Sequence, residues 1–316
     1  METKTIVIDE LATLSCYLVA DSPELMRGKP RPAMIINPGG GYFSCSDREA
    51  EPVALFFANL GYHAFVLRYA AYNDNGLELP DLSKPLPPKD DRIFPKQVQE
   101  LGKAMLEIRD HAHDWHVDTT RIGVCGFSAG GHNAVVYATS YQEGFIAGAL
   151  NVPAEALRPA VAILGYPLTD YYMVQANLAT NTNPMDAAFM KASNVALFGT
   201  ETPDEDALTA ASPTRHVRKT TPPMFLWCTA ADPLLGSRQV LALADALAKQ
   251  QVPYEAHIFE EGPHGLSLAT QATAEARSQI NPTVGQWTTL CATWLAKRFS
   301  LPLPELSAFE KMQQQS

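Results

Sequence analysis

Residues 121–132 of the chain read Arg-Ile-Gly-Val-Cys-Gly-Phe-Ser-Ala-Gly-Gly-His. The first five residues predict a buried strand that ends at Cys125, and a helix is expected from about Ser128 onward. Between them, residues 126–130 match the pattern G-x-S-x-G, which in a strand–turn–helix context is typical of a sharp turn that presents a nucleophilic serine. Flanking glycines are needed there because a Cβ would collide with neighbouring backbone. We therefore expect Ser128 at the carboxyl end of a strand. The plainer alternative is a serine that only caps the helix.

Outward from this turn, apolar runs alternate with helical patterns along most of the chain. Residues 4–8 and 14–20 predict an opening antiparallel pair. Further strands are expected at 33–36, 63–67, 161–164, 224–228 and 254–259, and helices at 47–60, 96–116, 237–251 and 284–298. Such alternation predicts an α/β fold: a doubly wound, mostly parallel sheet with helices on both faces.

The length of 316 residues would allow two domains of about 150 residues each. The pattern instead predicts one domain over residues 1–300. Two irregular segments interrupt it, residues 72–95 with five prolines and residues 168–218 with one short helix around 184–192. We expect both segments to be lid or cap insertions. Residues 301–316 are expected to form a polar tail.

Composition narrows the classes of partner and compartment. The net charge is −10. Binding to nucleic acids or anionic membranes needs clustered cations, so neither is expected as a partner. The five cysteines are odd in number and widely spaced, which indicates a reducing cytoplasm rather than a disulfide framework. The sequence shows neither a signal-peptide pattern nor an apolar stretch long enough to span a membrane. We expect a cytoplasmic protein whose partner is a small molecule.

A nucleophilic serine needs a general base and a carboxylate that orients it. In this strand order both follow the serine, each in a loop after a late strand. Asp232 directly follows the predicted strand 224–228, and His264 lies in the turn-rich loop after strand 254–259. We predict that Asp232 orients His264 and that His264 activates Ser128. The alternatives are an Asp-Pro turn residue and a polar turn histidine.

The developing negative charge of such a reaction needs backbone N–H donors. Ala129, the residue after the nucleophile, is expected to supply one of them. The early loop Asn37-Pro-Gly-Gly-Gly-Tyr42 is expected to supply the other, since three successive glycines allow close approach of backbone to substrate. No cofactor or metal is expected: His111, His113 and His116 do not share one helix face.

Taken together, the motifs resemble a known family. The matching blocks are residues 38–42, 46–54 with Gly61-Tyr62, 126–132, and the loops of Asp232 and His264. The chain is similar over roughly residues 30–300 to bacterial α/β-hydrolase carboxylesterases related to acetyl-xylan and sugar acetylesterases, with kinship to hormone-sensitive-lipase-like enzymes. The resemblance implies oxyanion donors at Gly40, Gly41 and Ala129. Pro38 departs from the lipase-like pattern, which has a histidine there, but leaves the glycine amides in place.

We therefore expect a serine carboxylesterase with an acyl-enzyme intermediate. The resemblance implies short, acetyl-type acyl groups on sugars or xylo-oligosaccharides. A feruloyl or aryl esterase, a serine peptidase and an inactive hydrolase-fold binding protein are the alternatives. The natural substrate and self-association are left open. So are the roles of Arg48 and Glu49, which either line the pocket or form an ion pair, while His132 is expected to be a buried structural residue one helical turn after Ser128.

Overall fold

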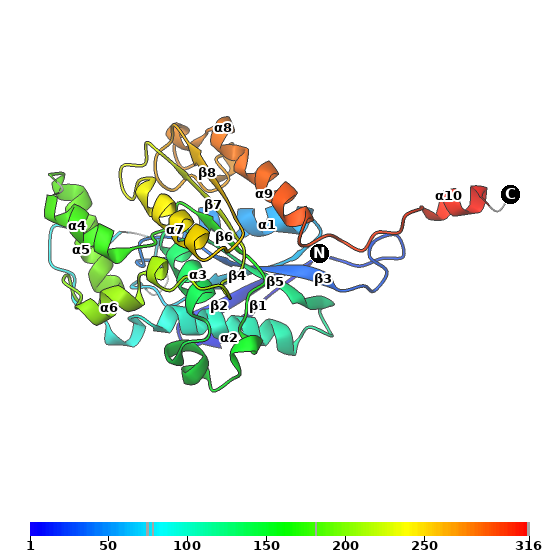
Figure 1. Ribbon diagram of the computed structural model, residues 1–316, viewed down its shortest axis with the longest axis horizontal. Coiled ribbons are helices and arrows are strands. Elements are labelled where there is room, and N and C mark those ends of the chain that lie inside the picture. Colours follow the sequence, from blue (N-terminus) through cyan, green and yellow to red (C-terminus); the bar gives the residue numbers. More distant parts are fainter. Residues whose placement is uncertain (74–75, 78, 181, 315–316) are drawn as a thin grey trace.

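The computed structural model describes residues 1–73, 76–77, 79–180 and 182–314, and within these ranges the strands form one mixed sheet. They are β1 (Glu2–Asp9), β2 (Ala12–Leu18), β3 (Arg31–Asn37), β4 (His63–Arg68), β5 (Val117–Phe127), β6 (Ala162–Gly165), β7 (Met224–Thr229) and β8 (Tyr254–Phe259). The strand order is β1-β2-β4-β3-β5-β6-β7-β8 (Figure 1). The β1–β2 and β2–β4 pairs are antiparallel and all later pairs are parallel, which confirms the predicted opening pair and mostly parallel sheet.

The burial of each strand follows its position in the sheet. Every residue of β3, β6 and β7 is buried, as expected for parallel strands covered on both faces, which read as continuous apolar runs. The edge strand β8 instead alternates between exposed and half-buried residues. The central strand β5 lies between β3 and β6, pairing Cys125 with Ile36 and Phe127 with Gly165. The turn after β5 therefore starts at the middle of the sheet.

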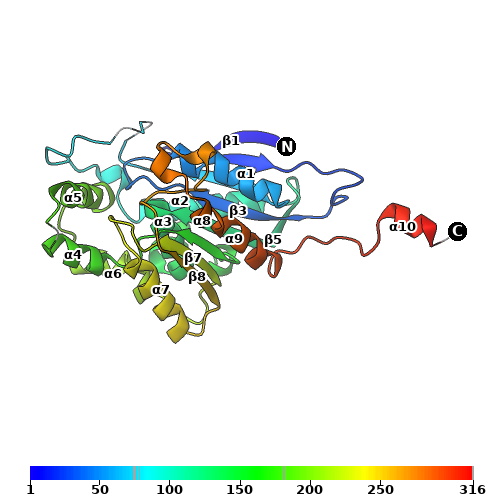
Figure 2. The ribbon, with the colours of Figure 1, turned by 90° about the horizontal axis from the view of Figure 1, so that it is seen from above.

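Helices cover both faces of this sheet, as predicted (Figures 1 and 2). On one face α1 (Glu51–Asn59) and α9 (Trp287–Ala296) lie together, with the rings of Phe56 and Trp287 5.6 Å apart at their centroids. On the other face α2 (Lys96–Asp110) packs against α3 (Ser128–Ser140). Further helices are α7 (Arg238–Lys249), α8 (Pro282–Gly285) and, in the tail, α10 (Ala308–Gln313).

The segment 168–218 corrects one expectation, because it is helical rather than irregular. It contains α4 (Tyr171–Thr180), α5 (Pro184–Phe198) and α6 (Glu205–Ala210). The helix α5 extends six residues beyond the short helix predicted at 184–192. Asn183 caps its first turn, and Gly199 ends it in the left-handed conformation, with φ of 73°. Its interior carries mixed rather than strictly periodic polarity, so the helical pattern is weak. Residue 181 of this segment lies outside the described residues.

The segment 72–95 shows only one short 3₁₀ turn, Asp90–Arg92, in its described part. Residues 74, 75 and 78 of the predicted insertion lie outside the described residues.

The tail contains α10, whose N-terminus is capped by Ser307 and Glu310; Figures 1 and 2 show this helix away from the body of the molecule. Residues 315–316 of the predicted tail are not described. The single domain over 1–300 and the role of the insertions as lids stay predictions.

Among the helices of the described ranges, none combines the length and the apolar composition of a membrane-spanning segment. The cytoplasmic location stays a prediction.

Candidate active site

The turn that carries Ser128 joins the central strand β5 to helix α3. Ser128 adopts a φ of 51°, a left-handed conformation that a non-glycine residue holds only when its surroundings enforce it. The enforcing contact is close packing of the turn on the end of β3, since a Cβ on Gly130 would collide with the carbonyl oxygen of Asn37. The side chain of Ser128 therefore stands at the carboxyl end of the sheet.

The structure brings Ser128, His264 and Asp232 together in one line of hydrogen bonds. The Oγ of Ser128 lies 2.8 Å from Nε2 of His264, and Nδ1 of His264 lies 2.7 Å from Oδ2 of Asp232. A carboxylate accepts only, so Nδ1 donates to Asp232. It follows that Nε2 is the acceptor for the Ser128 hydroxyl, which is the arrangement that a general base requires.

Asp232 is held as a charged carboxylate although its side chain is only 1 % exposed. Burial raises its pKa, but the hydrogen bond and charge of His264 and the amides of Leu234 and Leu235 act in the opposite direction and leave the pKa below its usual value. Those amides donate to Oδ1 over 2.8 Å and 3.2 Å. The loop after β7 thus supplies both the carboxylate and the donors that stabilise its charge.

The glycine loop after β3 lies directly against the serine. A Cβ on Gly39 would lie 2.9 Å from the Cβ of Ser128, so only glycine allows this approach. The amide of Gly39 donates to Oε2 of Glu49 over 2.7 Å. Because that amide is already occupied, the loop's donors toward a substrate must come from the residues after it.

The three predicted oxyanion donors border the space at Ser128 from two sides. Gly40 and Gly41 line a cavity that also reaches Ser128. Ala129 lines a smaller cavity at Ser128, which Gly41 borders as well. It lies in the first turn of α3, where backbone amides have no acceptor within the helix. Gly40 has a φ of 138° and Gly41 a φ of 61°, values that turn the loop around the serine and that favour glycine.

A buried network, whose partners the sequence did not reveal, links this loop to the loop of His264. The hydroxyl of Tyr166 donates to Oε1 of Glu49 over 2.5 Å and accepts from the amide of Ser267 over 2.8 Å. Burial raises the pKa of Glu49, against the hydrogen bonds from Tyr166 and Gly39. The ring of Tyr166 also packs edge-on against the imidazole of His264, with centroids 5.0 Å apart.

Arg48 fixes the chain that follows His264. Its Nη2 donates to the carbonyl of Gly265 and its Nε to the carbonyl of Thr273, both over 2.6 Å. Arg48 also borders the cavity at Ser128. Two carbonyls, rather than the neighbouring carboxylate of Glu49, take these donors. The sequence left open whether Arg48 and Glu49 line the pocket or form an ion pair, and no local pattern indicates partners more than 100 positions away.

His132 is fully buried, as expected. Its Nε2 lies 2.7 Å from the carbonyl oxygen of Ala211 and must donate to it. Nδ1 therefore accepts from the hydroxyl of Tyr42, 2.5 Å away. Burial lowers the pKa of His132 to about 4, so the ring is neutral near pH 7. It joins the glycine loop to the segment after α6.

Two cavities of different size meet at Ser128. The larger, about 420 Å³, includes His264, Arg48 and Gly265. The smaller, about 20 Å³, includes Ala129 and residues of α4 and α5. Within the described part of the chain, no three His, Cys, Asp or Glu side chains gather as a metal ion would require. A mechanism without metal or cofactor stays a prediction.

Comparison with known proteins gives matches over most of the chain. A family model described as BD-FAE matches residues 88–247. The carboxylesterase Cest-2923 from Lactobacillus plantarum is 25% identical, with a TM-score of 0.75 over 96% of this chain and 100% of its own. An acetyl ester-xyloside bifunctional hydrolase from Caldicellulosiruptor lactoaceticus is 30% identical, with a TM-score of 0.68 over 90% of this chain and 88% of its own.

Among curated proteins, endo-1,4-beta-xylanase B from Butyrivibrio fibrisolvens is 28% identical over 242 residues, which are 76% of this chain and 33% of the xylanase. The chain spans less than half the length of the curated relatives it matches.

Proposed function

Because the chain belongs to the BD-FAE family of α/β hydrolases, we propose that it is a serine esterase that hydrolyses short acyl esters through an acyl-enzyme. The observation that carries the proposal is the unbroken line of hydrogen bonds from Ser128 through His264 to Asp232. A serine hydroxyl is a weak nucleophile by itself and is activated by an adjacent base that a third group orients.

In the proposed reaction the Oγ of Ser128 attacks the ester carbonyl carbon while Nε2 of His264 takes the hydroxyl proton. The resulting oxyanion accepts hydrogen bonds from the amides of Gly40, Gly41 and Ala129. The imidazolium, stabilised by Asp232, then gives its proton to the leaving alcohol as the C–O bond breaks. Water, deprotonated by the same nitrogen, attacks the acyl-enzyme and releases the acid and Ser128.

The two cavities support the assignment of acyl and alcohol sides. Nε2 of His264 must reach the leaving oxygen, so the alcohol belongs in the cavity of about 420 Å³ that His264 borders. The polar side chains of Ser46, Asp47 and Arg48 line that space beside the apolar ones of Leu77, Leu79 and Phe189, a mixture that suits the hydroxyl groups and the apolar faces of a sugar. The acyl group then belongs on the Ala129 side.

The acyl side is small. A cavity of about 20 Å³ is close to the roughly 10–15 Å³ that one water molecule needs, and a methyl group is of similar size. This supports acetyl esters over the bulkier feruloyl or aryl esters. Acetylated sugars or xylo-oligosaccharides are the substrates we propose, in keeping with the acetylxylan esterase of Xylanibacter ruminicola among the relatives.

The test is the rate of hydrolysis of p-nitrophenyl acetate by the wild type, by Ser128→Ala and by Ser300→Ala. Ser300 is the control because it is an exposed serine that follows helix α9. We expect Ser128→Ala to lose at least about 10³-fold in kcat, with a circular dichroism spectrum like that of the wild type. Ser300→Ala should keep full activity. Retained turnover in folded Ser128→Ala would overturn the proposal, and acetylated xylo-oligosaccharides assayed in parallel test the sugar substrate.

A further inference from the structure

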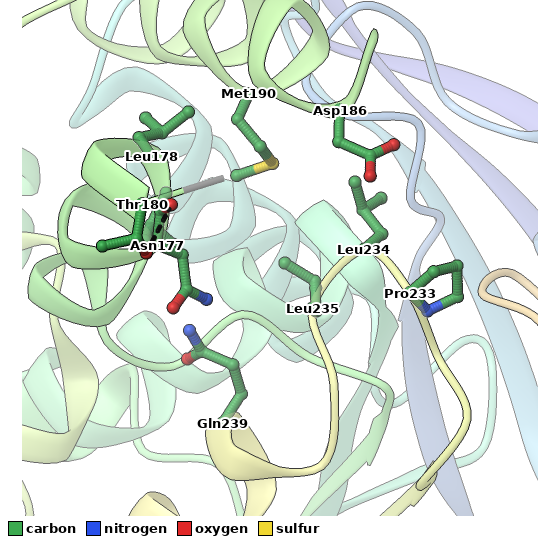
Figure 3. A pocket seen from close by; sticks show the side chains of 10 residues that line it. Asn177, Leu178, Thr180, Asp186, Met190, Pro233, Leu234, Leu235 and Gln239 are labelled. Atoms are coloured by element: carbon green, nitrogen blue, oxygen red, sulfur yellow. Dashed lines mark hydrogen bonds between the residues drawn. The ribbon is translucent and has the colours of Figure 1, made fainter. Parts of the chain in front are cut away.

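A further cavity, distinct from the two that meet at Ser128, lies beside the smaller of these two. It measures about 210 Å³ and is bordered by α4, α5, the loop after β7 and the start of α7, with Val174, Leu178, Asp186 and Gln239 among its lining residues. Figure 3 shows these elements around the cavity, with the side chain of Met190 pointing into it from α5. Nothing in the proposed mechanism uses this space.

This further cavity shares a wall with the small cavity at Ser128. Met190, Leu234 and Leu235 border both the cavity of about 20 Å³ and the cavity of about 210 Å³. Figure 3 shows Met190 descending from α5 and the two leucines rising from the loop after β7. These three side chains therefore form a partition between the space at Ser128 and a space about ten times larger.

Each half of the partition is fixed by contacts to the active site itself. On α5, three residues after Met190, the hydroxyl of Ser193 donates to the carbonyl of Gly41 over 2.9 Å. Phe189, one residue before it, packs edge-on against Phe43 with centroids 5.4 Å apart. The backbone amides of the two leucines donate hydrogen bonds to Oδ1 of Asp232, which holds their loop in place. The partition thus keeps its place relative to Ser128.

From this geometry we infer that Met190 determines the length of the acyl group that the enzyme accepts. Its side chain closes the acyl side just beyond the room for a methyl group, and the larger cavity lies behind it. Met190 is 7% exposed, so its side chain is packed against its neighbours rather than directed into solvent. Its removal would join the two cavities and give a longer acyl chain a route past Leu235 toward the apolar side chains of Val174 and Leu178, in a cavity that Asn177, Asp186 and Gln239 also line. The inference rests on the proposed esterase function and on the acyl group lying on the Ala129 side.

The test is the ratio of kcat/KM for p-nitrophenyl hexanoate to that for the acetate, in the wild type and in Met190→Ala. Each added methylene in a fitting apolar pocket is worth about tenfold or more, so we expect the ratio to rise at least about tenfold in the variant. Met185→Ala is the matched control, since Met185 lies on the same helix but is 64% exposed and borders neither cavity among the lining residues described. It should keep the wild-type ratio.

A double variant, Met190→Ala with Leu178→Trp, refills the larger cavity and should return the ratio toward that of the wild type. An unchanged ratio in folded Met190→Ala, or a raised ratio that Leu178→Trp leaves in place, would overturn the inference. If Met190→Ala does not fold by circular dichroism, Leu235→Ala opens the same partition from the other side and is judged by the same ratio. Failure of the esterase proposal itself is distinguishable, because the wild type would then not hydrolyse the acetate through Ser128.

Discussion

Single atoms decide the chemistry of Asp232. Its Oδ2 lies 2.7 Å from Nδ1 of His264, and its Oδ1 accepts from two amides of its own loop. All the donors that stabilise the buried charge are therefore in place before a substrate arrives. A carboxylate in this position fixes the imidazole tautomer, which leaves Nε2 free to accept the proton of Ser128.

Asp232→Asn should lower kcat for p-nitrophenyl acetate by about 10³- to 10⁴-fold while leaving KM nearly unchanged. The reason is that the amide of asparagine donates to Nδ1, which places the imidazole proton on Nε2 and removes the base. Asp245→Asn, on the exposed surface of α7, is the control. A kcat for Asp232→Asn within tenfold of the wild type would contradict the role of this carboxylate.

At the scale of elements, the ends of strands were predictable and the contacts between loops were not. Strand and turn signals are local, so Ser128, Asp232 and His264 could each be assigned to a loop at the carboxyl edge. The bonds of Glu49 to Tyr166 and of Arg48 to Gly265 join residues 117 and 217 positions apart. No local pattern encodes such partners. The helices α4 and α6 escaped prediction, and α5 was predicted only as a short helix at 184–192, because packing rather than a periodic apolar face stabilises them.

Glu100 shows how burial of one charge couples an element to pH. It lies on α2, and its Oε2 accepts from the amide of Ala70, just after β4. Burial raises its pKa from 4.5 to about 7, against the hydrogen bond from Ala70 and the charge of Lys96. Between these two pH values the folded chain keeps a proton that the unfolded chain has lost, so the contribution of Glu100 to stability falls as the pH rises.

Replacement of Glu100 by glutamine should remove this fall. The free energy of unfolding of the wild type, relative to that of Glu100→Gln, should decrease by about 3 kcal/mol from below pH 4.5 to above about pH 7. Urea denaturation at a series of pH values measures it, with Glu24→Gln in an exposed loop as the control. Parallel pH profiles for the wild type and Glu100→Gln would contradict the assignment.

At the scale of the whole molecule, the sheet gathers distant segments at one edge. The glycine loop after β3, the serine turn after β5, the carboxylate loop after β7 and the histidine loop after β8 all follow carboxyl ends of parallel strands. Parallel strands bring such loops together whatever their separation in sequence. The helices α4 and α5 contribute side chains to the small cavity at Ser128. The order of the strands thus made the positions of these loops predictable, while the dimensions of the cavity depend on side chains of α4 and α5.

Covalent labelling distinguishes a nucleophilic Ser128 from a serine that only caps helix α3. The protein is treated with a fluorophosphonate and the modified residue is located by mass spectrometry of its peptides, beside an identical experiment on Ser128→Ala. We expect one label per chain, on Ser128, complete loss of p-nitrophenyl acetate hydrolysis in step with labelling, and no label on the variant. An unlabelled Ser128 in a protein that still hydrolyses the ester would contradict the role of Ser128 as the nucleophile.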